Sequence, residues 1–164
     1  MLRLLRLLTA LAILLPSASV ALAADRAADA ATIRADITAV LDPDTGRDAP
    51  RLPRVGIDPT GDLTVIFGMR REDDDPAHIG QGGLADSLTI LRAVYQSEAA
   101  GQLRTTTVLG TYASWTKLLR IRELPLLRVT VSAATAARLD WDALTPGDLR
   151  SVADDFWMQD EIVP

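Results

Sequence analysis

Apolar side chains recur at helical spacing in two stretches of the chain, so that each stretch would present one apolar face. Within residues 28–41 the face consists of Ile33, Ile37, Val40 and Leu41. Within residues 84–97 it consists of Leu84, Leu88, Leu91, Val94 and Tyr95. We therefore predict helices over 28–41 and 84–97.

Alternation with a period of two, or enrichment in β-branched residues, predicts four strands. They are residues 54–57, 63–69, 103–112 and 117–132. The turn between the first two contains Pro59 and Gly61, as a hairpin turn favours. Pro125 interrupts the last stretch, so we expect a bend, a bulge or an edge position there.

Two further helices are predicted near the C-terminus from their capping residues. Ser132 can cap a helix over 133–139, and Thr145-Pro146 followed by Asp148 is typical of another helix start. The apolar face of that last helix would consist of Leu149, Val152, Phe156 and Trp157. On this interpretation Trp157, and also Trp141, lie in or near the core.

The order of elements is thus α-β-β-α-β-β-α-α, which indicates an α+β fold. We expect a two-layer sandwich with one antiparallel sheet of about four strands and the helices on one face. Residues 53–164 would form this domain, preceded by an N-terminal helix and a linker rich in proline and arginine over residues 24–52. Whether the helix 28–41 packs on the domain or trails from it is left open.

The first 23 residues have the pattern of a secretory signal peptide. Arg3 and Arg6 precede an apolar stretch over 7–15, and Ala21-Leu22-Ala23 has the small-x-small form of a cleavage site. We predict cleavage after Ala23 and a secreted or periplasmic form that is soluble and free of the membrane. An uncleaved anchor is the alternative, since residues 7–24 carry no charge.

Composition excludes several classes of site. The chain has 164 residues, no cysteine, one histidine and a net charge of −5. It therefore contains no disulfide, thiolate metal site or cysteine nucleophile, and one chain cannot provide a two-histidine metal site. The acidic balance disfavours nucleic acid as a partner, because such binding begins with neutralising phosphates.

Two short motifs resemble catalytic or cofactor signatures without the context that those signatures need. Gly80-Gln81-Gly82-Gly83-Leu84-Ala85 matches G-x-G-x-x-A, but no strand directly precedes it. We interpret it as a flexible hinge leading into a helix whose N-terminus could hold an anion. Ser114-Trp115-Thr116-Lys117 matches S-x-x-K, yet the chain lacks the S-D-N and K-T-G elements that accompany it. We interpret Lys117 as a solvated turn residue.

Residues 70–83 are predicted to form a long loop, and a loop of that length is often functional. It contains the densest acidic group of the chain, Glu72, Asp73, Asp74 and Asp75. Four carboxylates could bind a hard cation, but their spacing does not match a calcium loop and Arg70 and Arg71 precede them. We expect solvated charge there, and an ordinary exposed His78. Among the tryptophans, Trp115 is the candidate for contacting a partner.

Residues 129–157 carry a series of short motifs: a strand, an alanine-rich helix start, Leu139-x-Trp141, Pro146-x-x-Leu149 and Ala153-Asp154-x-Phe156. This segment resembles the closing part of uncharacterised bacterial exported α+β domains, which have a hairpin, a helix and a second hairpin ahead of it. The resemblance implies the fold and export, and no activity. The chain differs from the lipidated members because it lacks cysteine.

These observations predict an exported, soluble α+β domain that acts as a non-catalytic binding or structural module. We expect a protein or cell-envelope component as its partner, with no cofactor, no bound metal and no catalytic residue. Two alternatives stay open. One is a hydrolase outside the cytoplasm that uses two of the 22 acidic residues. The other is a membrane-anchored interaction module with an uncleaved N-terminus.

Overall fold

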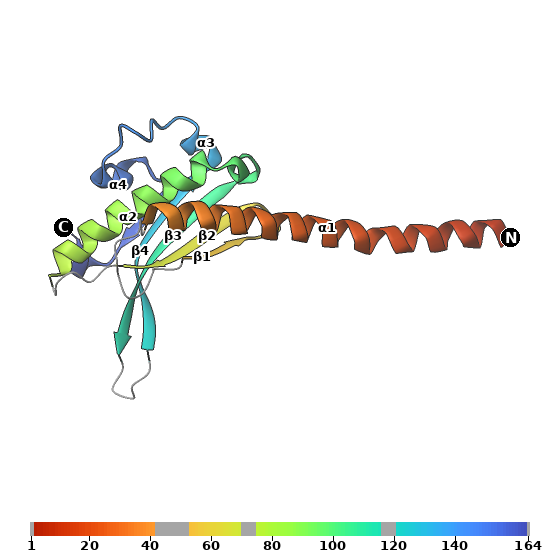
Figure 1. Ribbon diagram of the computed structural model, residues 1–164, viewed down its shortest axis with the longest axis horizontal. Helices are drawn as coiled ribbons and strands as arrows, with labels where there is room; N and C mark the ends of the chain where they lie inside the picture. Colours follow the sequence, from red (N-terminus) through yellow and green to blue (C-terminus); the bar gives the residue numbers. More distant parts are fainter. Residues whose placement is uncertain (1, 42–52, 70–74, 116–120, 164) are drawn as a thin grey trace.

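The computed structural model describes the backbone of residues 2–41, 53–69, 75–115 and 121–163, and the side chains within 21–41, 53–69, 75–112 and 123–163. Its longer elements are α1 (Leu2–Leu41), β1 (Arg54–Ile57), β2 (Asp62–Gly68), α2 (Pro76–Gln96), β3 (Thr105–Trp115), β4 (Ile121–Ser132) and β5 (Asp155–Met158). The short helices are η1 (Glu98–Gln102), α3 (Ala133–Ala136), η2 (Pro146–Asp148), α4 (Leu149–Val152) and η3 (Asp160–Ile162). The helices lie on one side of the sheet, and the N-terminal part of α1 projects from the body (Figure 1).

The predicted α+β class, with helices on one face of a single sheet, is confirmed. The sheet has five strands in the order β1-β2-β3-β4-β5 rather than about four. It is also mixed rather than antiparallel, because β2 and β3 are parallel whereas the other neighbours are antiparallel. The physical reason is α2, which returns the chain to the starting end of β2 so that β3 runs in the same direction.

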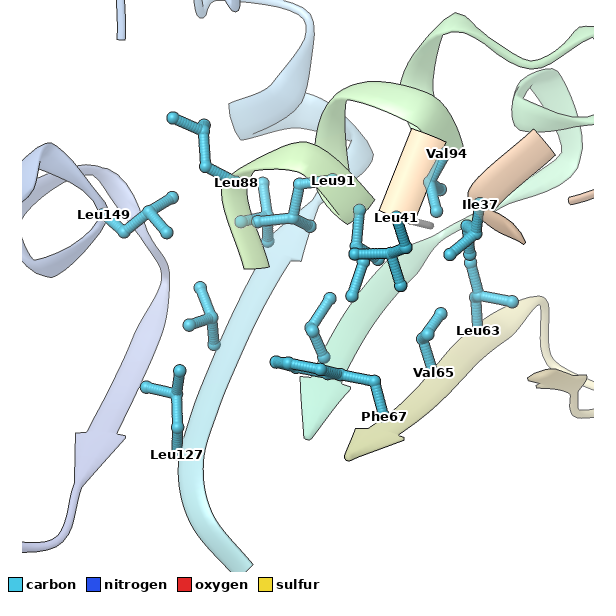
Figure 2. Packing of buried hydrophobic residues seen from close by; sticks show 14 of the residues in the cluster. Ile37, Leu41, Leu63, Val65, Phe67, Leu88, Leu91, Val94, Leu127 and Leu149 are labelled. Atoms are coloured by element: carbon cyan, nitrogen blue, oxygen red, sulfur yellow. The ribbon is translucent and has the colours of Figure 1, made fainter. Parts of the chain in front are cut away.

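Alternate side chains of the central strands form the core with the helices. Leu63, Val65 and Phe67 of β2 are at most 2% exposed, and they point towards the helices (Figure 2). From α1 the core receives Ile33, Ile37 and Leu41, which are likewise buried. From α2 it receives Leu84, Leu88, Ile90, Leu91 and Val94. The C-terminal part of α1 therefore packs on the domain, which answers the question that its sequence leaves open.

The prediction of a loop over residues 70–83 is wrong for residues 76–83, because α2 begins at Pro76. Asp75 caps this helix by accepting a hydrogen bond from the Ala77 backbone, and proline at the first helical position strengthens the start. Glycines 80 and 83, which suggested a hinge, are buried in the helix. A Cβ at Gly83 would lie 2.2 Å from Met69 Cε, so glycine permits close packing of α2 on the sheet.

The predicted C-terminal helix is also wrong beyond its start. The cap at Thr145 forms as expected, with its hydroxyl and backbone N–H both donating to Asp148. The helical stretch nevertheless ends at Val152, and Asp155–Met158 pairs with β4 as strand β5. Phe156 and Trp157 consequently lie on opposite faces of a strand, and Trp157 is 41% exposed instead of being near the core.

Trp141 is partly buried, as predicted, and stacks on Tyr95 of α2 with ring centroids 5.3 Å apart. The Tyr95 hydroxyl donates to the Val131 carbonyl of β4 at 2.7 Å, and burial raises the pKa of this phenol. Arg92 donates to the carbonyls of Trp141 and Leu144. These bonds attach the segment after α3 to the outer face of α2.

The irregularity predicted at Pro125 is confirmed. Gly110 pairs with Leu127 and Thr111 with Pro125, so that Leu126 has no residue opposite it. Beyond this point β3 and β4 continue as a two-stranded ribbon past the ends of β2 and β5, and the ribbon projects from the sheet (Figure 1).

Candidate functional site

The candidate site is a groove of about 560 Å³ between α1 and the edge strand β1. Its volume lies in the range of pockets that bind small molecules. It is lined by Leu22, Ala23, Arg26, Ala27, Ala30, Ala31, Arg34, Val55, Gly56, Ile57 and Pro59. Apolar side chains therefore make most of its wall, and two guanidinium groups are the charged part.

The groove exists because α1 presents small side chains to the sheet edge. The alanines at positions 23, 27, 30 and 31 recur on one helical face, and a methyl group fills little of the space towards β1. Val55 and Ile57 form the opposite wall, with Val55 only 8% exposed. One turn further on, Ile33 and Ile37 fill the corresponding space, and α1 there joins the core.

Arg26 and Arg34 cross from α1 to the edge of the sheet. Arg34 donates to the Val55 carbonyl at 3.2 Å, and Arg26 donates to the Asp58 carbonyl. Within the part of the chain that the structure describes, neither guanidinium forms a salt bridge with a carboxylate. The two positive charges are therefore held by neutral carbonyl groups beside an apolar wall.

The turn between β1 and β2 supports the far end of the groove. Asp58 accepts hydrogen bonds from the Thr60 hydroxyl and from the backbone of Thr60 and Asp62. Arg104, at the start of β3, donates to both carboxylate oxygens of Asp62. Gly61 has φ 87°, a conformation that favours glycine, and a Cβ there would lie 3.0 Å from the Gln102 carbonyl.

Electrostatics at this turn favour two ionised carboxylates. The Arg104 guanidinium, helped by the Thr105 hydroxyl, holds the pKa of Asp62 far below its usual range. The hydrogen bond from the Thr60 hydroxyl is the main cause of a lowered pKa at Asp58. The carboxylates of Asp58 and Asp62 accept hydrogen bonds from their own turn, from Arg104 and from Thr105 of β3. These bonds fix the position of the turn at the end of the groove.

The structure separates the residues that the sequence singled out. His78 is exposed, as predicted, but it lies in the first turn of α2, with Nδ1 3.9 Å from the Asp75 carboxylate. Gly80-Gln81-Gly82-Gly83-Leu84-Ala85 lies inside α2, so no helix N-terminus is available there. Ser114 and Trp115 belong to β3. Glu72, Asp73, Asp74, Thr116 and Lys117 lie outside the described residues.

The described residues contain neither a metal-binding cluster nor a membrane-spanning helix. In these residues no group of three or more histidine, aspartate or glutamate side chains is arranged to hold a metal ion. No helix in the same part of the chain is long and apolar enough to cross a membrane.

Sequence reasoning missed the groove, although one signal was present. Alanines at helical spacing over 23–31 give one face of α1 only short side chains. Arginines at 26 and 34 lie beside that face. That pattern identifies a thin helix face. It does not show that β1 lies opposite, because this contact joins residues that are 21 and 32 positions apart in the chain.

Comparison of the chain with protein-family models, with curated proteins and with solved structures finds no match. The resemblance of residues 129–157 to exported bacterial domains therefore stays a prediction.

Proposed function

We propose that this chain is a non-catalytic binding module that works outside the cytoplasm and holds a small acidic amphiphile in the groove between α1 and β1. The observation that carries the proposal is the pairing of an apolar wall with Arg26 and Arg34, which form no salt bridge among the described residues. A ligand with a hydrocarbon body and an acidic head would complement both parts.

Arg26 and Arg34 differ from several other arginines of this acidic chain in their hydrogen-bond partners. The chain has a net charge of −5, and Arg54, Arg104 and Arg128 form salt bridges with acidic residues. Arg26 and Arg34 instead use their N–H groups on backbone carbonyls, which also protects the exposed edge of β1. Each guanidinium has five N–H donors, so donors are left for a carboxylate or phosphate.

Export is part of the proposal and rests on the N-terminal pattern. Cleavage after Ala23 would remove Leu22 and Ala23 from the open end of the groove. It would leave the lining from Arg26 to Arg34 and the whole β1 wall in place. The new terminal ammonium of Ala24 would add a positive charge two residues before Arg26, which favours the same ligand class.

The hydrolase alternative gains little support from the acidic residues. Glycosidase-type chemistry needs one carboxyl group that keeps its proton at working pH, and hence a raised pKa. Where the pKa of a described carboxyl group shifts clearly, at Asp58, Asp62, Asp148 and Asp154, it is lowered. Asp58 and Asp62, which share the Thr60 hydroxyl as a hydrogen-bond partner, are already engaged in the turn between β1 and β2.

Isothermal titration of the purified protein with laurate, below its micelle concentration, tests the proposal. We expect one molecule bound per chain, and binding weakened about tenfold or more in each of R26Q and R34Q, because a charge-assisted hydrogen bond contributes about 1.5–3 kcal/mol. Dodecyltrimethylammonium, which has a tail of similar length and a cationic head, should bind far more weakly.

Arg150→Gln is the matched control, because Arg150 is exposed on α4 and lies over Phe156, away from the groove. Its laurate affinity should equal that of the wild type. Equal affinity in all four proteins, or equal affinity for the cationic and anionic amphiphiles, would contradict the proposal. Circular dichroism of each variant separates loss of binding from loss of fold.

A further inference from the structure

The sheet face turned away from the helices carries side chains in regular rows. Pairing registers place one residue from every strand in a single row, which consists of Arg54, Ile66, Leu109, Arg128 and Trp157. The next row consists of Gly56, Thr64, Thr107, Thr130 and Asp155. With strands about 4.8 Å apart, each row crosses about 19 Å of surface.

No described helix covers this face, and its side chains are accordingly accessible (Figure 1). Trp157 is 41% exposed at one end of the first row. Ile66 and Leu109 are half-buried in the middle of the row, and Arg128 lies between this apolar pair and the tryptophan. The exposed indole by itself offers a flat apolar surface for a ligand, and its neighbour in the row is the polar side chain of Arg128.

The charged groups of this face neutralise one another. Arg128 pairs with Asp155 at 2.8 Å, and Arg54 pairs with Glu123. Arg104 and Asp62 form a third pair at the start of β2. The described part of the face is thus close to neutral although the chain has a net charge of −5, and a neutral ligand bound there would not need to compensate a charge.

Hydroxyl groups supply the remaining polar surface. Thr107 and Thr130 are hydrogen-bonded to each other at 3.0 Å between β3 and β4. Thr105 donates to Asp62, and Thr111 donates to the Phe67 carbonyl. A hydroxyl that donates one bond keeps acceptor lone pairs, so the row of threonines can accept further hydrogen bonds from hydroxyl groups of a ligand.

We propose that this open sheet face binds a neutral polysaccharide chain. A sugar ring has an apolar C–H face that fits Trp157, and a rim of hydroxyl groups that fits the threonines and the paired Arg128 and Asp155. The chemical match is with an uncharged, hydroxyl-rich, extended molecule, and the absence of net charge on the face favours it over an anionic polymer. This surface is separate from the groove, which lies on the helix side of β1.

Affinity electrophoresis in native gels tests the proposal with defined polymers: hydroxyethylcellulose, galactomannan, dextran and glycogen, with polygalacturonate as the anionic comparison. We expect at least one neutral polymer to retard the wild type, and W157A to lose about tenfold or more in affinity for it. W157F, which keeps an aromatic ring, should stay within about threefold of the wild type.

Thr64→Arg places a bulky side chain in the middle of the face and should also weaken retardation, while Val163→Ala, at a similarly exposed position elsewhere, should leave it unchanged. The proposal is overturned if no neutral polymer retards the protein, or if W157A binds as well as the wild type. It is also overturned if sedimentation shows a dimer that W157A dissociates, because a second copy would then cover this face.

Discussion

Two neighbouring rows of the sheet, one residue apart along every strand, show how differently its two faces are used. The row facing the helices consists of Val55, Val65, Val108, Val129 and Phe156. Its four valines are at most 8% exposed. The adjacent row runs from Arg54 to Trp157 and contains two ion-paired arginines. A shift of one residue thus separates a uniform core layer from a mixed, accessible one.

The two rows differ in what determines their amino-acid composition. The valine row is apolar throughout because α1 and α2 cover it, and its composition follows from packing alone (Figure 2). The open row is not covered by the helices, so packing leaves its tryptophan, paired charges and neighbouring threonines accessible to a ligand. Recognition of a ligand determines the composition of this row in our account.

The largest expected effect comes from placing a carboxylate in each row. V108D would bury an unpaired charge at a position with 0% exposure, a cost of several kcal/mol that is comparable with the whole stability of a domain. L109D, one residue further, would place the same group on the open face and should cost about 1–2 kcal/mol. Urea denaturation should find V108D largely unfolded and L109D folded. Similar stabilities would show that the two faces are not distinguished as described.

A second prediction asks whether α1 belongs to the covered layer. I37A should lower the free energy of unfolding by about 2–5 kcal/mol, because Ile37 is completely buried against the sheet. V40A, at a position 45% exposed on the same helix, should change it by about 0.5 kcal/mol or less. If both variants unfold at the same urea concentration as the wild type, the helix is a detached linker.

Adjacent aromatic residues on β5 give a smaller contrast. F156A should destabilise the protein by about 2 kcal/mol, since Phe156 is partly buried and lies under the Arg150 guanidinium. W157A should cost about 1 kcal/mol or less, although it removes the larger side chain. Thermal unfolding of both variants checks the order. The reverse order would place Trp157 in the core and return Asp155–Met158 to the helix that the sequence predicts.

The smallest expected effect is the pH dependence of stability that comes from the polar clusters. It is absent near neutral pH and arises only in acid. Asp58, Asp62 and Asp154 have folded-state pKa values below those of the unfolded chain, so their contribution to stability is complete above about pH 4. It is lost as the pH falls below 4 and these groups take up protons. The unfolding midpoint should therefore be flat from pH 7 to 5 and drop below pH 4. D62N should show a shallower drop, and an unchanged slope would exclude the turn cluster as its cause.

Periodicity predicted most of the fold because burial repeats locally. The stripe of 84–97 and the alternation in 63–69 and 127–132 both concern contacts within one element, and both are found in the structure. The start of α2 was also encoded locally, in Asp75-Pro76, but three following glycines suggested a loop. The role of Gly83 depends on Met69 across the interface, which spacing along the chain does not show.

Other features could not be predicted because they depend on distant pairing. The strand character of Asp155–Met158 depends on β4, and Phe156 at helical distance from Val152 mimics a helix face. The parallel direction of β3 depends on the path of α2. The groove needs both α1 and the edge of β1, and the alanines alone reveal one side of it.

The most direct test of the account is a map of amide chemical shifts in the protein titrated with laurate. We predict that the largest shifts occur at Ala27, Ala30 and Ala31 of α1 and at Gly56 and Ile57 of β1, while Thr107 and Trp157 on the open face stay unchanged. Shifts centred on the open face, or no saturable shifts at all, would contradict the assignment of the groove as the binding site.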